Sequence, residues 1–341
     1  RTGTLAQLRQ PSPLEPSSRA LACGSCSTTS VVCRRRRAWV QSRPPPRFGC
    51  AFSVANLLLV VVCLLAGALM RRSGRLPDAS PVVATRIVID LALPALTLVS
   101  VHELTLVPNQ WTNLGIAFGT PFVAFAVAAL ALGAFARVFG WTRQVTACLL
   151  LTAGLANTSF VGFPLVEALW GREGLALAVW VDQGQFFVLS TFGAITASVG
   201  VGRGSPRWRE LARRVVAFPP FVAFVLAVAR WPVTFPAVVV GSLEKLAALV
   251  VPLALFAVGW QLRLDPRVLG EHARPLVIGL GVRLALVPLI VYLIVQRVLG
   301  STGLAGDVAV AEAAMAPMIT GALLAMEHEL SPRLATAMVG I

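Results

Sequence analysis

The sequence predicts an all-α integral membrane protein of ten helices, arranged as two inverted repeats of five. Three observations support this prediction. Of the 341 residues, 57% are hydrophobic and 13% are charged, and the mean hydropathy is +0.79; a soluble domain carries roughly 25% charged residues. The apolar residues gather in runs of membrane-spanning length. Stretches that contain proline also recur at nearly the same spacing in the two halves of the chain.

The apolar runs have the length of helices. A hydrocarbon core of about 30 Å needs roughly 20 apolar residues per helix, whereas a barrel strand shows about 10 residues of alternating hydrophobicity. Nine runs meet the helical requirement, and a tenth begins near residue 334. In chain order they cover residues 51–70, 80–101, 113–137, 144–169, 174–199, 215–230, 237–261, 275–298 and 308–326.

The basic residues predict how these helices are oriented. Fourteen arginines lie in one set of alternate connections and three in the other. The positive-inside rule therefore places the odd-numbered loops in the cytoplasm and the start of the first helix outside. This bias explains the net charge of +14. We therefore expect a lipid bilayer, and no nucleic acid, as the partner of the basic residues.

Residues 1–50 differ from the rest of the chain. Pro, Ser and Arg dominate there, and no apolar periodicity is present, so we expect either a disordered tail or a mis-assigned upstream extension. The remaining chain divides into three parts: a first five-helix repeat at 51–199, a basic cytoplasmic linker at 200–214 and a second repeat at 215–341.

The internal repeat is read from four prolines. Pro94 in LALPAL and Pro252 in VVPLAL are 158 residues apart, and Pro164 and Pro317 are 153 apart. Five helices in each half force opposite orientations in the bilayer, a plan in which interrupted helices at corresponding positions mark a binding site. The counterpart of the fifth run would extend beyond Ile341, so we expect the tenth helix to be truncated.

Two of the runs contain the elements of a helix break. Pro164 lacks the N–H that a helix in lipid needs, and Gly162 tolerates unusual dihedrals, so we expect the fourth helix to be split there. Pro317, with Thr320 and Gly321, predicts the same split in the ninth helix. The freed N–H groups at a half-helix N-terminus carry partial positive charge and can bind a carboxylate.

Polar side chains accompany the first break. Asn157, Thr158 and Ser159 supply an amide and two hydroxyls that can donate to carboxylate oxygens. The alternative is a kink whose backbone groups are satisfied by local side chains. Because two breaks occupy matched positions in the repeats, we favour a binding site.

Ionisable residues within the runs need a role, because one at a helix centre costs on the order of 2.5–3.5 kcal/mol on insertion scales. Asp182 and Gln185 lie one helical turn apart and therefore share a face. They form either part of a proton- or cation-coupling site or a hydrogen-bonded strut, and the sequence favours neither. Asp90 lies four residues after Arg86, which favours a structural salt bridge.

Arg283 in the eighth run has two interpretations: it pairs with Glu312 across helices, or it is a counter-charge for the substrate. Glu167, three residues after Pro164, would repel an anion unless it is protonated or points away. The three histidines lie at run ends or in loops, and the CxxC at 23–26 has no second pair at zinc spacing. We therefore expect neither a metal nor a cofactor.

Several stretches together resemble the auxin efflux carrier family. They are NTSFVGFPLVEALWG, DLALPAL, VVPLALFAVGWQL and AEAAMAPMITGALLAMEHELSPRLATAMVGI, and the resemblance covers roughly residues 52–341. That family includes plant auxin exporters and bacterial members described as carriers of malonate or other organic anions. The resemblance implies a ten-helix fold like that of the bile-acid sodium symporters, in which the broken fourth and ninth helices cross. A transport domain then moves against a scaffold domain. Phe218-Pro219-Pro220 stands where relatives often have an Asn-Pro pair, which leaves the substrate open.

The sequence thus predicts a secondary active transporter in the cytoplasmic membrane that moves a small mono- or dicarboxylate by alternating access. The energy source is the membrane potential, a coupled proton or sodium, and both a monomer and a homodimer remain open. One alternative is a membrane sensor built on a carrier fold. An intramembrane enzyme is less favoured, since the sequence shows neither a Ser-His pair nor the Gly-x-Gly-Asp context of aspartyl intramembrane proteases.

Overall fold

The computed structural model describes residues 54–77, 79–105, 111–202, 204, 206–229, 235–261 and 272–340. These residues form helices joined by short turns, together with an isolated antiparallel bridge between Ala156 and Pro317. The predicted all-α class is therefore confirmed. The extension predicted at 1–50 lies outside the described residues.

The first half of the membrane-embedded chain begins at α2. Its helices, where η marks a π-helical turn, are α2 (Val54–Ser73), α3 (Ser80–Ile87), η1 (Val88–Ala92), α4 (Leu93–Thr105), α5 (Trp111–Phe139), α6 (Arg143–Ala153), η2 (Thr158–Gly162), α7 (Phe163–Val188), η3 (Leu189–Gly193) and α8 (Ala194–Gly200). The predicted run at 80–101 is therefore one helix with a π-helical turn in its middle.

The second half begins inside the predicted linker. Its helices are α9 (Trp208–Val216), α10 (Pro219–Ala229), α11 (Ala237–Ala247), α12 (Val250–Gln261), α14 (Ala273–Gly281), η4 (Val282–Leu286), α15 (Val287–Tyr292), η5 (Leu293–Val298), α16 (Leu304–Ala313), α17 (Ile319–Glu327) and α18 (Pro332–Gly340). The basic stretch at 208–214 therefore forms most of α9.

Five helical stretches in the described part of the chain are long and apolar enough to cross a membrane. They are Ser80–Val101, Trp111–Phe139, Thr158–Gly200, Ala237–Trp260 and Ala273–Val298. The pair α9 and α10, which is bent by 77° just before Pro219, makes a sixth if it is counted as one span. The protein is therefore a multi-pass membrane protein.

The fourth and fifth predicted runs meet at Gly171. This residue lies inside α7 with φ 64° and ψ −156°, a conformation that glycine adopts at low cost and other residues do not. The two runs are therefore joined by a tight kink and not by a loop. The kink lets the second arm of α7 return toward the start of the first.

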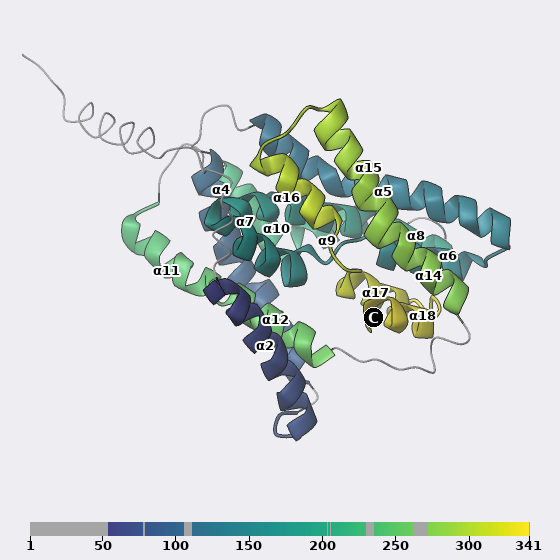
Figure 1. Ribbon diagram of the computed structural model, residues 1–341, viewed down its shortest axis with the longest axis horizontal. Coiled ribbons are helices and arrows are strands. Elements are labelled where there is room, and N and C mark those ends of the chain that lie inside the picture. The colour runs from purple at the N-terminus through teal and green to yellow at the C-terminus, as the bar shows by residue number, and fades with distance from the viewer. Residues whose placement is uncertain are drawn as a thin grey trace, which may run out of the picture. The chain divides into compact units, whose positions relative to one another are not determined.

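Close packing between α2 and α12 depends on two glycines (Figure 1). A Cβ on Gly67 would lie 2.8 Å from the Trp260 nitrogen, and a Cβ on Gly259 would lie 2.9 Å from Leu64 Cα. Small residues of this kind let transmembrane helices approach until their backbones touch. The two helices therefore hold each other through backbone contact.

Two apolar cores organise the described helices. One gathers buried side chains mainly from α5, α6, α14, α15, α17 and α18, and the other gathers them mainly from α4, α5, α7 and α12. Helices α7 and α16 contribute to both, for example through Val188 and Ala313 in the first core and Val181 and Val308 in the second. The chain breaks before η2 and after α16 lie near this junction.

Candidate functional site

Two helix breaks cross and pair with each other. Helix α6 ends at Ala153 and α16 ends at Ala313, and a short irregular segment with one bridge residue follows each. The Asn157 N–H donates to the Ala316 carbonyl at 2.9 Å, and the Met318 N–H donates to the Leu155 carbonyl at 3.1 Å. The chain thus satisfies its interrupted backbone by a short antiparallel bridge in place of helical bonds.

Pro317 fits this bridge because of its position within it. Ala156 and Pro317 face each other between the two hydrogen bonds, so the bridge needs no N–H from either residue. A proline is tolerated at such a position, since it removes no hydrogen bond from the ladder. The expected break at Pro317 is present.

The first break lies elsewhere than predicted. Pro164 is the second residue of α7, and the non-helical segment at 154–157 contains no proline. The π-helical turn η2 precedes Pro164, and in it the Gly162 N–H donates to the Asn157 carbonyl at 3.1 Å. Pro164, which has no N–H, therefore lies where π-helical hydrogen bonding gives way to α-helical hydrogen bonding. Gly162 itself is helical, with φ −64°. The prediction of a split at Gly162 and Pro164 was wrong by about two helical turns.

The break leaves two half-helix N-termini without caps. Asn157 and Met318 occupy the N-cap positions of η2 and α17, and neither makes a side-chain cap hydrogen bond. Six backbone N–H groups have no hydrogen-bond acceptor among the described residues; they belong to Thr158, Ser159, Phe160, Ile319, Thr320 and Gly321. Such groups carry the partial positive charge of a helix N-terminus.

The hydroxyl groups of Thr158 and Ser159, which were expected to face a substrate, donate hydrogen bonds to Asp182. Its Oδ1 accepts hydrogen bonds from Thr158 Oγ1 and Ser159 Oγ, and Asp182 is 4% exposed. The kink at Gly171 makes this contact feasible, because it turns the second arm of α7 back toward η2. The hydroxyls of Thr158 and Ser159 are therefore engaged by the protein itself.

Arg283 donates hydrogen bonds at the C-terminal ends of α6 and α16, the helices that precede the two breaks. Its guanidinium donates to the carbonyls of Ala313, of Met315 at 2.9 Å and of Ala153 at 3.4 Å, and the residue is 0% exposed. Ala153 and Ala313 are the last residues of α6 and α16, where the helix dipoles place negative charge. Arg283 thus neutralises two helix C-termini, a role that the sequence did not reveal.

Glu312 was considered from the sequence only as a partner of Arg283, yet this residue lies at the crossing. It lies in the last turn of α16, it is 0% exposed, and both carboxylate oxygens lack a hydrogen-bond partner among the described residues. A Cβ on Gly162 would lie 2.6 Å from Glu312 Cδ, so the carboxyl group rests directly against the first turn after the break. A lone glutamate in the apolar stretch AEAAMAP was the available signal.

Four further residues were predicted to belong to the site, and the structure gives each a different environment: Gln185, Thr320, Gly321 and Asp90. Gln185 is 2% exposed, with no partner for its Nε2 atom. Thr320 is exposed, and Gly321 is buried where a Cβ would clash with the Leu151 carbonyl, so Gly321 serves helix packing. Asp90 is exposed on η1, and no ion pair joins it to Arg86 in the described residues, so the predicted salt bridge was wrong.

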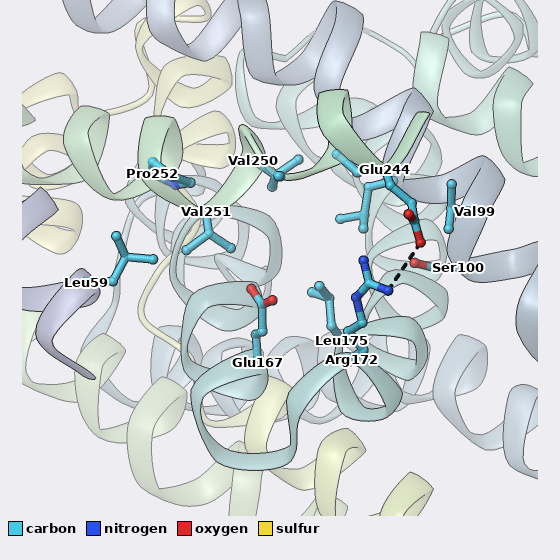
Figure 2. A pocket seen from close by; sticks show the side chains of 13 residues that line it. Leu59, Val99, Ser100, Glu167, Arg172, Leu175, Glu244, Val250, Val251 and Pro252 are labelled. Atoms are coloured by element: carbon cyan, nitrogen blue, oxygen red, sulfur yellow. Dashed lines mark hydrogen bonds and ion pairs between the residues drawn. The ribbon is translucent and has the colours of Figure 1, made fainter. Parts of the chain in front are cut away.

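A separate cavity of about 270 Å³ lies beside α7 (Figure 2). It is lined from α2, α4, α7, α11 and α12, and the residues of the crossing do not line it. Arg172 and Glu244 form a 3.2 Å ion pair at its edge, and Figure 2 shows Glu167 directed toward Val251. Pro252 also lines this cavity.

Comparison with known proteins agrees with this membrane architecture. The sequence pattern of the family described as membrane transport protein matches residues 52–203 and 207–341. The chain belongs to this family. The predicted resemblance to auxin efflux carriers is thereby confirmed.

Two relatives also carry transporter names. An uncharacterized transporter of Methanothermobacter thermautotrophicus is 29% identical over 296 residues, which is 84% of this chain and 92% of the relative. The uncharacterized transporter MJ1031 of Methanocaldococcus jannaschii is 27% identical over 223 residues, which is 62% of this chain and 69% of the relative. This member of the membrane transport protein family is therefore a membrane transporter.

Proposed function

We propose that this transporter is a secondary active carrier that moves a small mono- or dicarboxylate across the cytoplasmic membrane by alternating access. One observation carries the proposal: two uncapped half-helix N-termini meet at a bridged crossing and together present six unpaired N–H groups. An anion binds at such ends without a cationic side chain. Arg283 supports this arrangement, because it neutralises the C-terminal ends that would otherwise repel an anion.

The substrate contacts follow from this arrangement. The carboxylate oxygens accept from the N–H groups of Thr158 and Ser159 on one side and of Ile319 and Thr320 on the other. The Asn157 amide is a further donor at the N-cap position. Pro164, Pro317, Gly162 and Gly321 shape the crossing and do not donate to the substrate.

The wider architecture of the proposal is a ten-helix inverted repeat. The fourth and ninth helices of this repeat are α6 with η2, and α16 with α17, each interrupted at the crossing. Helices α2 and α12 pack on each other, as do α4 and α10. These two pairs form the scaffold, against which the helices of the crossing move. The carrier is either a monomer or a homodimer.

The experiment that tests the function is uptake of radiolabelled mono- and dicarboxylates by proteoliposomes that contain the full chain. We expect uptake of at least one carboxylate and none of choline, an organic cation of similar size. Asn157→Ala should abolish this uptake while the protein still inserts. Thr196→Ala is the matched control. It removes an exposed hydroxyl on α8 that donates a hydrogen bond to the Phe192 carbonyl. Uptake of choline with rejection of every carboxylate would overturn the proposal.

A further inference from the structure

Glu312 has no role in the anion site proposed above, yet it lies against it. Its carboxyl group is fully buried, makes no hydrogen bond among the described residues and contacts Gly162 on the turn that begins at Thr158. A buried polar group without a hydrogen bond costs free energy, and a buried unpaired charge costs much more. The arrangement therefore calls for a cation bound at Glu312.

The charged groups that act on Glu312 come from two elements packed around the crossing. They are Asp182 on α7 and Arg283 on η4. No ion pair within 4 Å joins Glu312 to Arg283 in the described part of the chain, because the guanidinium is directed at the carbonyls of Ala313, Met315 and Ala153. Asp182 is satisfied by two hydroxyls. Of the two buried carboxylates in the described part of the chain, Glu312 is the one without a hydrogen-bond partner.

We propose that Glu312 is the proton-binding site of this carrier and that a proton and the carboxylate substrate are bound together. This inference rests on the proposed function, since it assumes an anion at the crossing. A proton needs no ligands beyond the carboxyl oxygen that holds it. A sodium ion would need the carbonyls of unwound helix ends, and Arg283 already occupies three of these.

Coupling follows from proximity. An anion held by the N–H groups of Thr158 and Ser159 lies on the turn that Glu312 contacts through Gly162. Two negative charges at this depth repel each other, because the protein interior screens them weakly. Binding of the anion therefore favours protonation of Glu312, and by reciprocity protonation of Glu312 favours binding of the anion.

The wild-type full chain in proteoliposomes gives the first test. The affinity for the carboxylate identified by the uptake screen should fall about tenfold per pH unit once Glu312 loses its proton, as one coupled proton requires. A pH indicator trapped in the vesicles should report proton entry with the substrate. A wild-type affinity that does not depend on pH would overturn the inference without any variant. Uptake that occurs in a sodium buffer and is lost when choline replaces sodium in that buffer would also overturn it.

Variants then assign the site. Glu312→Gln keeps the shape of the side chain and should bind the carboxylate with an affinity that no longer changes with pH, and without proton movement. Glu167→Gln, which changes a carboxylate at the separate cavity beside α7, is the matched control and should retain the pH dependence. Loss of the pH dependence in Glu167→Gln, or its persistence in Glu312→Gln, would refute the assignment to Glu312. Failure of the proposed function looks different: the wild type would then take up no carboxylate at any pH.

Discussion

The backbone N–H of Ile319 offers the sharpest test of the anion site. Ile319 is the first residue of α17, and its N–H has no acceptor among the described residues. Replacement by proline removes this donor and little else. Proline is favoured at the first position of a helix, and it requires an extended residue before it. Met318 already has φ −74° and ψ 125°, so the backbone needs no rearrangement.

The expected magnitude follows from one charge-assisted hydrogen bond. Such a bond contributes about 1.5–3 kcal/mol, which corresponds to about a 10- to 150-fold loss of carboxylate affinity at 1.4 kcal/mol per factor of ten. The Pro ring also fills the space in front of the lost N–H, which acts in the same direction. Thermal stability should not fall, because the substitution breaks no hydrogen bond of the resting protein.

Affinity is measured by calorimetry or by competition for uptake in nanodiscs or proteoliposomes. Ile319→Ala is the matched control, since it trims the same side chain and keeps the N–H. We expect Ile319→Ala to bind nearly as well as the wild type. If Ile319→Pro binds as tightly as Ile319→Ala while both remain folded, the anion is not held by the N-terminus of α17 and the reasoning fails.

Three further predictions concern stability, measured as the Tm of the purified full chain. Arg283→Met should lower the Tm by several degrees, because three buried carbonyls lose their donor and each unsatisfied group costs about 1–3 kcal/mol; an unchanged Tm would contradict the capping role. Gly259→Ala should also lower the Tm, since its Cβ meets the backbone of α2, whereas Gly241→Ala has open space and should raise it or leave it unchanged. A double-mutant cycle on Arg172→Ala and Glu244→Ala should give a coupling free energy below about 1 kcal/mol, because the two side chains are 71% and 34% exposed. A much larger coupling free energy would contradict this and would show that the ion pair stabilises the wall of the cavity.

The positions of the breaks illustrate how far local sequence reasoning reaches. Pro317 was correctly predicted to interrupt its helix, and it lies in the bridge itself. Pro164 was expected to do the same, yet the bridge pairs Pro317 with Ala156. A proline shows that a helix cannot bond normally at that point, but a π-helical turn can absorb the defect. Where the chain leaves the helix depends on the segment that it bridges to, which lies far away in the sequence.

The acidic residues make a similar point. Asp182 and Glu312 both stand out as carboxylates in apolar runs. A coupling role was offered from the sequence for Asp182, whereas Glu312 was considered only as a partner of Arg283. The tertiary structure separates them. Asp182 meets two hydroxyls from η2, and Glu312 meets a glycine that donates nothing to it. Asp90 had a partner at the right helical spacing, but an exposed pair gains too little to hold two side chains together.

The sequence by itself determined that the chain is helical, that it resides in a membrane and that two helices are interrupted. These properties depend on hydropathy, run length and the missing N–H of proline, all of which act locally. Only the tertiary structure decided which backbone groups the interruptions leave free, where Arg283 donates and which carboxylate lacks a partner. The reason is that hydrogen bonds in a dry interior form between segments more than 100 residues apart, such as 153–157 and 283 or 316–318, and their pairing follows from packing.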